Sequence, residues 1–124
     1  MPKYAGGVML KKIDTVNRSC EAGVIIAPAY HRAGMATDAL HFLLTFGFEE
    51  LKMHRINFIT AEANLGMRGW LERVLKAHHE GTQRDLWTDG KGAFINAVEY
   101  SVLESEWFQG GKASLESKMD SYTG

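Results

Sequence analysis

Cysteine and proline are scarce in this sequence, and it has no long apolar run. One cysteine, Cys20, and two prolines occur among its 124 residues. A lone cysteine excludes an internal disulfide framework and is compatible with a reducing compartment. No apolar run approaches the roughly 18 residues of a membrane span, and the first residues contain no apolar signal core. We therefore expect a soluble, cytoplasmic protein with no membrane partner.

Neither sign of charge is in excess. The 14 lysines and arginines nearly balance the 15 aspartates and glutamates, so the formal net charge is −1. Proteins that coat nucleic acids are normally far more basic, so we expect no nucleic-acid partner. The five histidines lack the spacing of metal ligands and no cysteine cluster joins them, so we expect no metal site.

Length and composition predict one globular domain. Apolar residues make up 45% and charged residues 23% of the chain, which is ordinary for a folded protein. A chain of this length can bury a core without disulfides or metals. We expect the domain to occupy residues 1–108. The remaining residues, 109–124, are polar and rich in glycine at their start, so we expect a mobile tail.

The apolar periodicity predicts the element order β-β-α-β-α-β-β. Strands are expected near 8–13, 19–27, 55–62, 81–87 and 93–103, and helices near 36–51 and 66–77. A strand–helix–strand unit is parallel, whereas a tight hairpin is antiparallel, so the predicted class is α/β with a mixed, mostly antiparallel sheet and a central parallel pair. The aromatic residues assigned to the core are Phe42, Phe46, Trp70 and Phe94.

The junction between the second strand and the first helix is the most informative segment. The N-terminus of a helix carries unpaired N–H groups and partial positive charge, which can hold a phosphate. Gly34 would let the backbone approach such a ligand, and His31 and Arg32 would add donors. The alternative is an ordinary capped loop that contains a glycine. The Gly-rich fingerprints of dinucleotide and nucleoside-triphosphate sites are absent, so spacing alone leaves both interpretations open.

The run from Pro28 to Leu40, PAYHRAGMATDAL, resembles the acetyl-CoA-binding motif of the GNAT superfamily of N-acetyltransferases, Arg/Gln-x-x-Gly-x-Gly/Ala. His31 stands at its first position, Gly34 at its glycine and Ala36 at its last small residue. Other stretches resemble the family in the same order, with the ribosomal-protein N-terminal acetyltransferases as the most similar branch. These stretches are 17–23, 48–51, 54–56, 80–82, 84–85, 98–101 and 106–107, together with Asn64.

The resemblance implies a GNAT-like acyl-CoA N-acyltransferase fold, here without the family's first strand and helices. It implies acetyl-CoA as co-substrate and direct transfer of the acetyl group to a primary amine in a ternary complex. The second and third strands are then expected to splay and to hold the pantetheine arm between them. The residues implied to contact acetyl-CoA are Val24, Ile25, Ile26, His31, Arg32, Ala33, Gly34, Met35, Ala36, Thr37 and Asn64.

The same resemblance implies two catalytic residues. Glu21 matches a position where family members often carry a carboxylate, and it is the candidate general base. Tyr100 is the candidate acid for the leaving thiolate. Both catalytic candidates have a structural alternative: Glu21 could face solvent or pair with Arg18 or Arg55, and Tyr100 could simply pack on a strand face. Asn64, from the acetyl-CoA-binding set, could instead cap a helix.

Two rival functions remain open. The chain could be a non-catalytic acyl-CoA-binding or regulatory remnant of the fold, or an interaction module that no longer binds the cofactor. The acceptor of an active enzyme could be a small-molecule amine or a peptide amine. The strand near Val8 should form an exposed edge, and an exposed edge favours pairing with a second copy, so a homodimer is expected.

Overall fold

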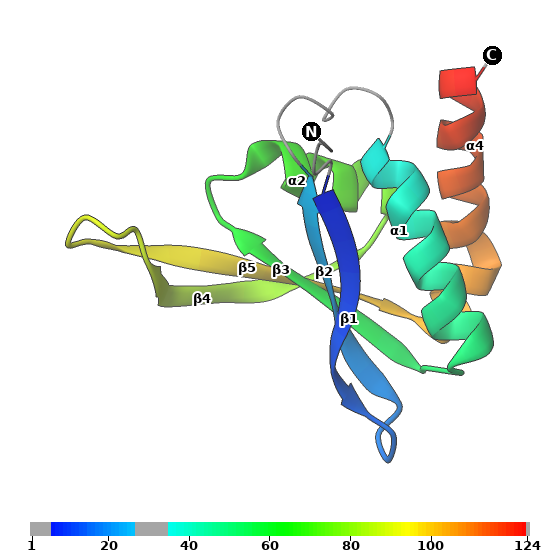
Figure 1. Ribbon diagram of the computed structural model, residues 1–124, viewed down its shortest axis with the longest axis horizontal. Coiled ribbons are helices and arrows are strands. Elements are labelled where there is room, and N and C mark those ends of the chain that lie inside the picture. Colours follow the sequence, from blue (N-terminus) through cyan, green and yellow to red (C-terminus); the bar gives the residue numbers. More distant parts are fainter. Residues whose placement is uncertain (1–5, 27–34, 124) are drawn as a thin grey trace, which may run out of the picture.

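The computed structural model describes residues 6–26 and 35–123 (Figure 1). None of the helices in this part of the chain is long and apolar enough to cross a membrane. The predicted order β-β-α-β-α-β-β is confirmed up to residue 103, and further helices follow it. The strands are β1 (Gly6–Asp14), β2 (Ser19–Ile26), β3 (Arg55–Ala61), β4 (His78–Thr88) and β5 (Phe94–Leu103). The helices are α1 (Met35–Thr45), α2 (Leu65–Trp70), α3 (Glu104–Glu106) and α4 (Lys112–Thr123), with wider π-helical turns η2 (Phe46–Glu50), η3 (Leu71–Leu75) and η4 (Trp107–Gly111).

The strands form one sheet in the order β1-β2-β3-β5-β4. The β2–β3 pair, which flanks the crossover through α1, is parallel, and the other pairs are antiparallel. The predicted mixed α/β sheet with one central parallel pair is therefore confirmed. Among the described residues, β1 has a strand neighbour on one side only, so it is an edge of this sheet as expected.

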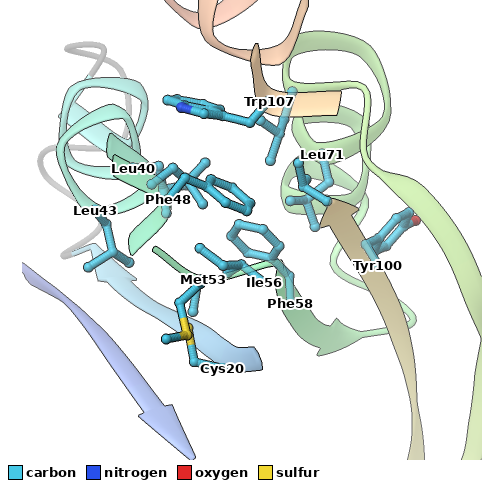
Figure 2. Packing of buried hydrophobic residues seen from close by; sticks show 14 of the residues in the cluster. Cys20, Leu40, Leu43, Phe48, Met53, Ile56, Phe58, Leu71, Tyr100 and Trp107 are labelled. Atoms are coloured by element: carbon cyan, nitrogen blue, oxygen red, sulfur yellow. The ribbon is translucent and has the colours of Figure 1, made fainter. Parts of the chain in front are cut away.

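The core lies between one face of the sheet and the helices. Alternate strand residues point to the same face, and the buried ones meet side chains from α1, η2, η3 and α4 (Figure 2). Trp107 and Phe48, both part of this cluster, stack with their ring centres 5.8 Å apart. The buried apolar strand residues of the core face are Cys20, Ala22, Ile56, Phe58, Val98, Tyr100 and Val102.

The segment after residue 108 differs from its prediction as a polar, mobile tail. It forms α4, which lies beside α1 (Figure 1), and Leu115 is completely buried. Glu49 accepts hydrogen bonds from Lys112 Nζ at 2.8 Å and from Trp107 Nε1 at 3.1 Å. These two bonds, with Lys112 as the larger cause, lower the pKa of the Glu49 carboxyl. The composition did not reveal this helix, because it is attached by one buried leucine and by polar contacts to residues distant in the chain. These polar contacts are Lys112 to Glu49, Ser114 to the Val74 carbonyl and Glu116 to His41.

Three of the four aromatic residues assigned to the core are exposed. Phe42 is 67% exposed, Phe46 42% and Phe94 62%. The inward face of α1 is already filled by residues such as Leu40 and Leu44, so Phe42 and Phe46, one turn apart, lie on its outer side. Trp70 packs against the core as expected.

We expect Leu115→Ala to lower the free energy of unfolding by about 2–5 kcal/mol, because it leaves a cavity where α4 meets the core. The matched control is Phe108→Ala, which removes a larger side chain that is 57% exposed and should change stability by less than about 0.5 kcal/mol. Urea denaturation measures both. Equal effects of the two substitutions would contradict the packing of α4 described above.

Candidate active site

The parallel pairing of β2 with β3 stops early. Only three register pairs join them, Ser19 with Arg55, Cys20 with Ile56 and Glu21 with Asn57. Beyond these pairs β2 continues to Ile26 and β3 to Ala61. The two strands therefore diverge toward their C-terminal ends and leave backbone groups on their facing edges without a partner strand.

A cavity of about 280 Å³ lies in this gap, and we call it the splay cleft. Ala22, Phe58 and Thr60 line it from the core face of the sheet. Glu21, Gly23 and Ile59 alternate with them along the two strands and line it from the opposite face. Because it has walls from both faces, the cleft passes through the sheet between the two strands.

A second cavity of about 510 Å³ adjoins the splay cleft on the sheet face opposite the core, and we call it the face trough. Its lining includes Asn57 and Glu99 from the central strands and Gln83 from β4. The two cavities share four lining residues, namely Lys11, Glu21, Ile59 and Trp87. A narrow passage between two strands thus opens into a broader polar trough.

Glu21 lies where the two cavities meet. Its side chain is only 9% exposed, and its carboxylate pairs with Lys11 Nζ at 3.3 Å and with Lys12 Nζ at 3.5 Å. The alternative pairing with Arg18 or Arg55 is wrong, because those side chains pair with other glutamates. A nearly buried carboxylate is thus compensated by two amines, and an amine that replaced one of the lysines would lie beside its oxygens.

Comparison with known proteins decides the family. The model of the family described as "Acetyltransferase (GNAT) domain" matches residues 2–74, more than half of the chain. This chain belongs to the GNAT acetyltransferase family. The resemblance read from the sequence is therefore confirmed.

Individual relatives agree with this assignment. The chain is 35% identical over 107 residues to the "Putative ribosomal N-acetyltransferase YdaF" of Bacillus subtilis, covering 82% of this chain and 55% of the relative. It is 35% identical over 60 residues to the spermidine N(1)-acetyltransferase of Escherichia coli K12, covering 48% of this chain and 32% of that protein. A crystal structure of a "putative acetyltransferase" superposes with a TM-score of 0.87 at 29% identity, covering 96% of this chain and 60% of that one. The chain thus spans about half or less of the length of these curated relatives.

The GNAT motif segment is described only in part. His31, Arg32, Ala33 and Gly34 lie outside the described residues. Val24, Ile25 and Ile26 belong to the stretch of β2 that has left β3 but still pairs with β1. Met35, Ala36 and Thr37 form the first turn of α1, where backbone N–H groups lack helical partners. The buried Thr37 hydroxyl accepts a hydrogen bond from Trp70 Nε1 at 2.9 Å. This bond links α1 to α2.

Asn64 serves as a helix cap and also lines the splay cleft. Its Oδ1 accepts a hydrogen bond from the Met67 backbone N–H at 3.1 Å, at the start of α2. The capping alternative is therefore confirmed. The cap also fixes the position of the Asn64 amide beside the cleft, so the two roles are compatible.

Tyr100 lies apart from Glu21, on the core face of the sheet. Its side chain is completely buried and lines neither the splay cleft nor the face trough. Its hydroxyl accepts a hydrogen bond from Arg68 Nε at 3.1 Å and donates one to Glu72. Burial is the main cause that raises the pKa of the Tyr100 phenol. The structure therefore does not bring the two catalytic candidates together.

Sequence reasoning missed the polar pair in the face trough. Asn57 Nδ2 donates to Glu99 at 3.0 Å, and Arg55 lies 3.3 Å from the same carboxylate. Asn57 also pairs in register with Glu21. Strand alternation could have assigned these residues to one face, but the order and register of the strands were needed to make them neighbours.

We expect Tyr100→Phe to lower the free energy of unfolding by about 1 kcal/mol, because it removes the hydroxyl that links Arg68 and Glu72. Glu72→Gln, which weakens the same link from its other end, is the matched variant. Denaturation and steady-state kinetics should be measured together. A fall in kcat of about 10²-fold or more for Tyr100→Phe, without a similar fall for Glu72→Gln, would assign Tyr100 the acid role.

Proposed function

We propose that this chain is an acetyl-CoA-dependent N-acetyltransferase that transfers an acetyl group to a primary amine by direct attack in a ternary complex. The observation that carries the proposal is the splay cleft between β2 and β3, with a carboxylate at its mouth. The splay cleft would bind the pantetheine arm of acetyl-CoA. The face trough would admit the acceptor amine from the other side.

The shape and the chemistry of the splay cleft fit a pantetheine arm. An extended chain that carries amide groups can add to an unpaired strand edge through backbone hydrogen bonds, and β2 offers such an edge at Val24, Ile25 and Ile26. Asn64 would contribute its side-chain amide from the wall of the cleft. Acetyl-CoA bound there supplies a thioester as the acetyl donor.

The first turn of α1 would hold the pyrophosphate. The backbone N–H groups of Met35, Ala36 and Thr37 stand at the helix start, where anions are favoured. The resemblance implies that His31, Arg32, Ala33 and Gly34 also bind acetyl-CoA, and that stays a prediction. The Thr37 side chain is engaged by Trp70, so Thr37 would contribute its backbone.

Glu21 would remove the proton from the attacking amine. The incoming amine would replace a lysine beside Glu21, and the carboxylate would accept the proton directly or through a water. General-base catalysis of this kind contributes on the order of 10²–10⁴ in rate. A backbone N–H near Ile25 would stabilise the oxygen that gains negative charge, an effect often worth roughly 3–4 kcal/mol.

The acceptor would be a cationic small-molecule amine or a peptide amine. The relatives are named for spermidine and for ribosomal N-acetylation, and both descriptions imply an amine acceptor. In the face trough, the carboxylate of Glu21 is paired with two lysines and that of Glu99 with Arg55, so an incoming amine would exchange with one of these cations. Trp87 provides an apolar surface. An amine with an apolar stem would suit these groups.

The rival function is acyl-CoA binding without transfer. Two observations favour it: Glu21 is already paired with two lysines, and Tyr100 lies away from the cleft. Such a remnant would bind acetyl-CoA but would acetylate no amine. Glu21→Gln separates the two functions, because it should reduce transfer by an enzyme and change no rate in a remnant.

We expect Ile59→Trp to raise the Kd for acetyl-CoA by at least about tenfold, equivalent to ~1.4 kcal/mol, because Ile59 lines the splay cleft and an indole there would narrow it. Isothermal titration calorimetry measures binding. Val16→Trp is the matched control, since Val16 is 88% exposed and lies in the β1–β2 turn.

Turnover should then be measured on a panel that includes spermidine and a peptide with a free N-terminus. Absence of binding at millimolar acetyl-CoA would refute the proposed function. Binding without transfer to any amine of the panel would support the remnant instead.

We also propose that the chain forms a homodimer through the free edge of β1. An edge strand presents unpaired N–H and C=O groups that can pair with a second copy, and β1 lies at the end of the strand order. Light scattering across a wide concentration range should give a mass that approaches twice that of the chain. A constant monomer mass at the highest concentration would contradict the dimer.

A further inference from the structure

We propose that Lys11 is itself an acetylation site, whose side-chain amine takes the acetyl group when no other amine occupies the face trough. This inference rests on the proposed acetyl-CoA-dependent function, and it adds a target within the chain. The geometry that points to it is the place of Lys11 at the junction of the splay cleft and the face trough.

A bulge in β1 turns two consecutive lysines toward one carboxylate. From Lys11 to Asp14, β1 advances three residues while β2 advances two, from Glu21 to Ser19. Lys12 lies in this bulge and has a left-handed backbone conformation, with φ of 53°. This conformation costs free energy for any residue that has a side chain. Neighbours on a regular strand point to opposite faces, yet both lysines reach Glu21. The bulge thus gathers two amines at a nearly buried carboxylate.

Of the two lysines, Lys11 is the one that reaches the splay cleft, where acetyl-CoA is proposed to bind. Its backbone pairs with Glu21, but its Cε lies 3.7 Å from the place where a Cβ on Gly23 would stand, two residues further along β2. The side chain therefore runs along the part of β2 that has left β3. Lys11 lines both cavities, whereas Lys12 lines only the face trough.

The burial of the two side chains agrees with this direction. Lys11 is 48% exposed and Lys12 is 73% exposed. Gly23 has no side chain, and a Cβ there would also meet Met9 Cγ at 3.3 Å. At 3.7 Å an added Cβ would make only ordinary van der Waals contact with Lys11, so the aliphatic stem of Lys11 passes close to Gly23 without depending on the missing side chain.

The transfer balances with acetyl-CoA as the only co-reactant. Glu21 first accepts one proton from the Lys11 ammonium, which frees the nitrogen lone pair. Lys11 Nζ then forms the amide bond to the acetyl carbon while the carbon–sulfur bond breaks and sulfur keeps its electron pair. The second proton passes from nitrogen to that sulfur, and Glu21 releases the first proton to solvent. The products are acetylated Lys11 and free CoA thiol.

Acetylation of Lys11 would change the junction permanently. The amide carries no charge and donates one hydrogen bond, so Glu21 would keep only Lys12 as an ionic partner. The acetyl group would also stand at the passage between the two cavities. The modified chain should therefore transfer acetyl groups to an added amine more slowly than the unmodified chain.

The first experiment incubates the full chain with acetyl-CoA and no added amine, and maps the acetylated lysines by mass spectrometry over time. Proximity makes an intramolecular transfer fast, so Lys11 should be acetylated at least about tenfold faster than Lys12. The rate should not depend on protein concentration. Lys11→Arg keeps the positive charge and should abolish the modification at this position without transferring it to Lys12. Lys12→Arg is the matched control and should leave acetylation of Lys11 in place.

The second experiment does not depend on transfer. An amine-reactive acetylating reagent is applied to the chain with and without CoA, and the reactivity of each lysine is compared. CoA should protect Lys11 at least about threefold more than Lys12 and more than Lys52, which is exposed and lines neither cavity.

The outcomes separate this proposal from the proposed function. If calorimetry detects acetyl-CoA binding but Lys11 is neither acetylated faster than Lys12 nor protected by CoA, the Lys11 proposal is overturned and the proposed function stands. If all exposed lysines react at equal rates, the acetylation is ordinary surface chemistry and the proposal is again overturned. If acetyl-CoA does not bind, both proposals fall together.

Discussion

The early end of the pairing between β2 and β3 is the constraint on which the rest of the site depends. Three register pairs hold the strands together, and beyond them each strand is supported from its other side, β2 by β1 and β3 by β5. The gap therefore persists without collapsing the sheet. Because strand residues alternate between faces, a gap between strands receives walls from both faces, which is why the splay cleft connects the core side of the sheet to the face trough.

The charges at this gap follow from the same geometry. Glu21 ends the paired stretch of β2, and its side chain is nearly buried. An uncompensated carboxylate in such a place would be costly, and removal of a partner from a buried ion pair is typically more harmful than the pair is beneficial. The bulge at Lys12 supplies a second cation next to Lys11. On the proposed function, this arrangement allows an amine substrate to exchange with a lysine while Glu21 always keeps one positive neighbour.

Much of the fold could be predicted from the sequence, because local periodicity determines it. Strand alternation places the consecutive residues Cys20 and Glu21 on opposite faces, and the structure has Cys20 in the core and Glu21 at the cleft. Features that depend on contacts distant in sequence could not be predicted. The Asn57–Glu99 pair joins β3 to β5, and the two lysines reach Glu21 only because of a bulge. α4 was missed because its attachment depends on Glu49, far from it in the chain.

The two walls of the splay cleft differ in a way that orients the proposed reaction. On the core side, the cleft ends against fully or nearly buried side chains, Phe58 and Leu71. On the other side, it opens past Glu21 into the polar face trough. A charged amine cannot approach through the apolar wall without losing its hydration, which is costly. An amine that reaches a thioester held in the cleft must therefore come through the trough and pass the carboxylate that can take its proton.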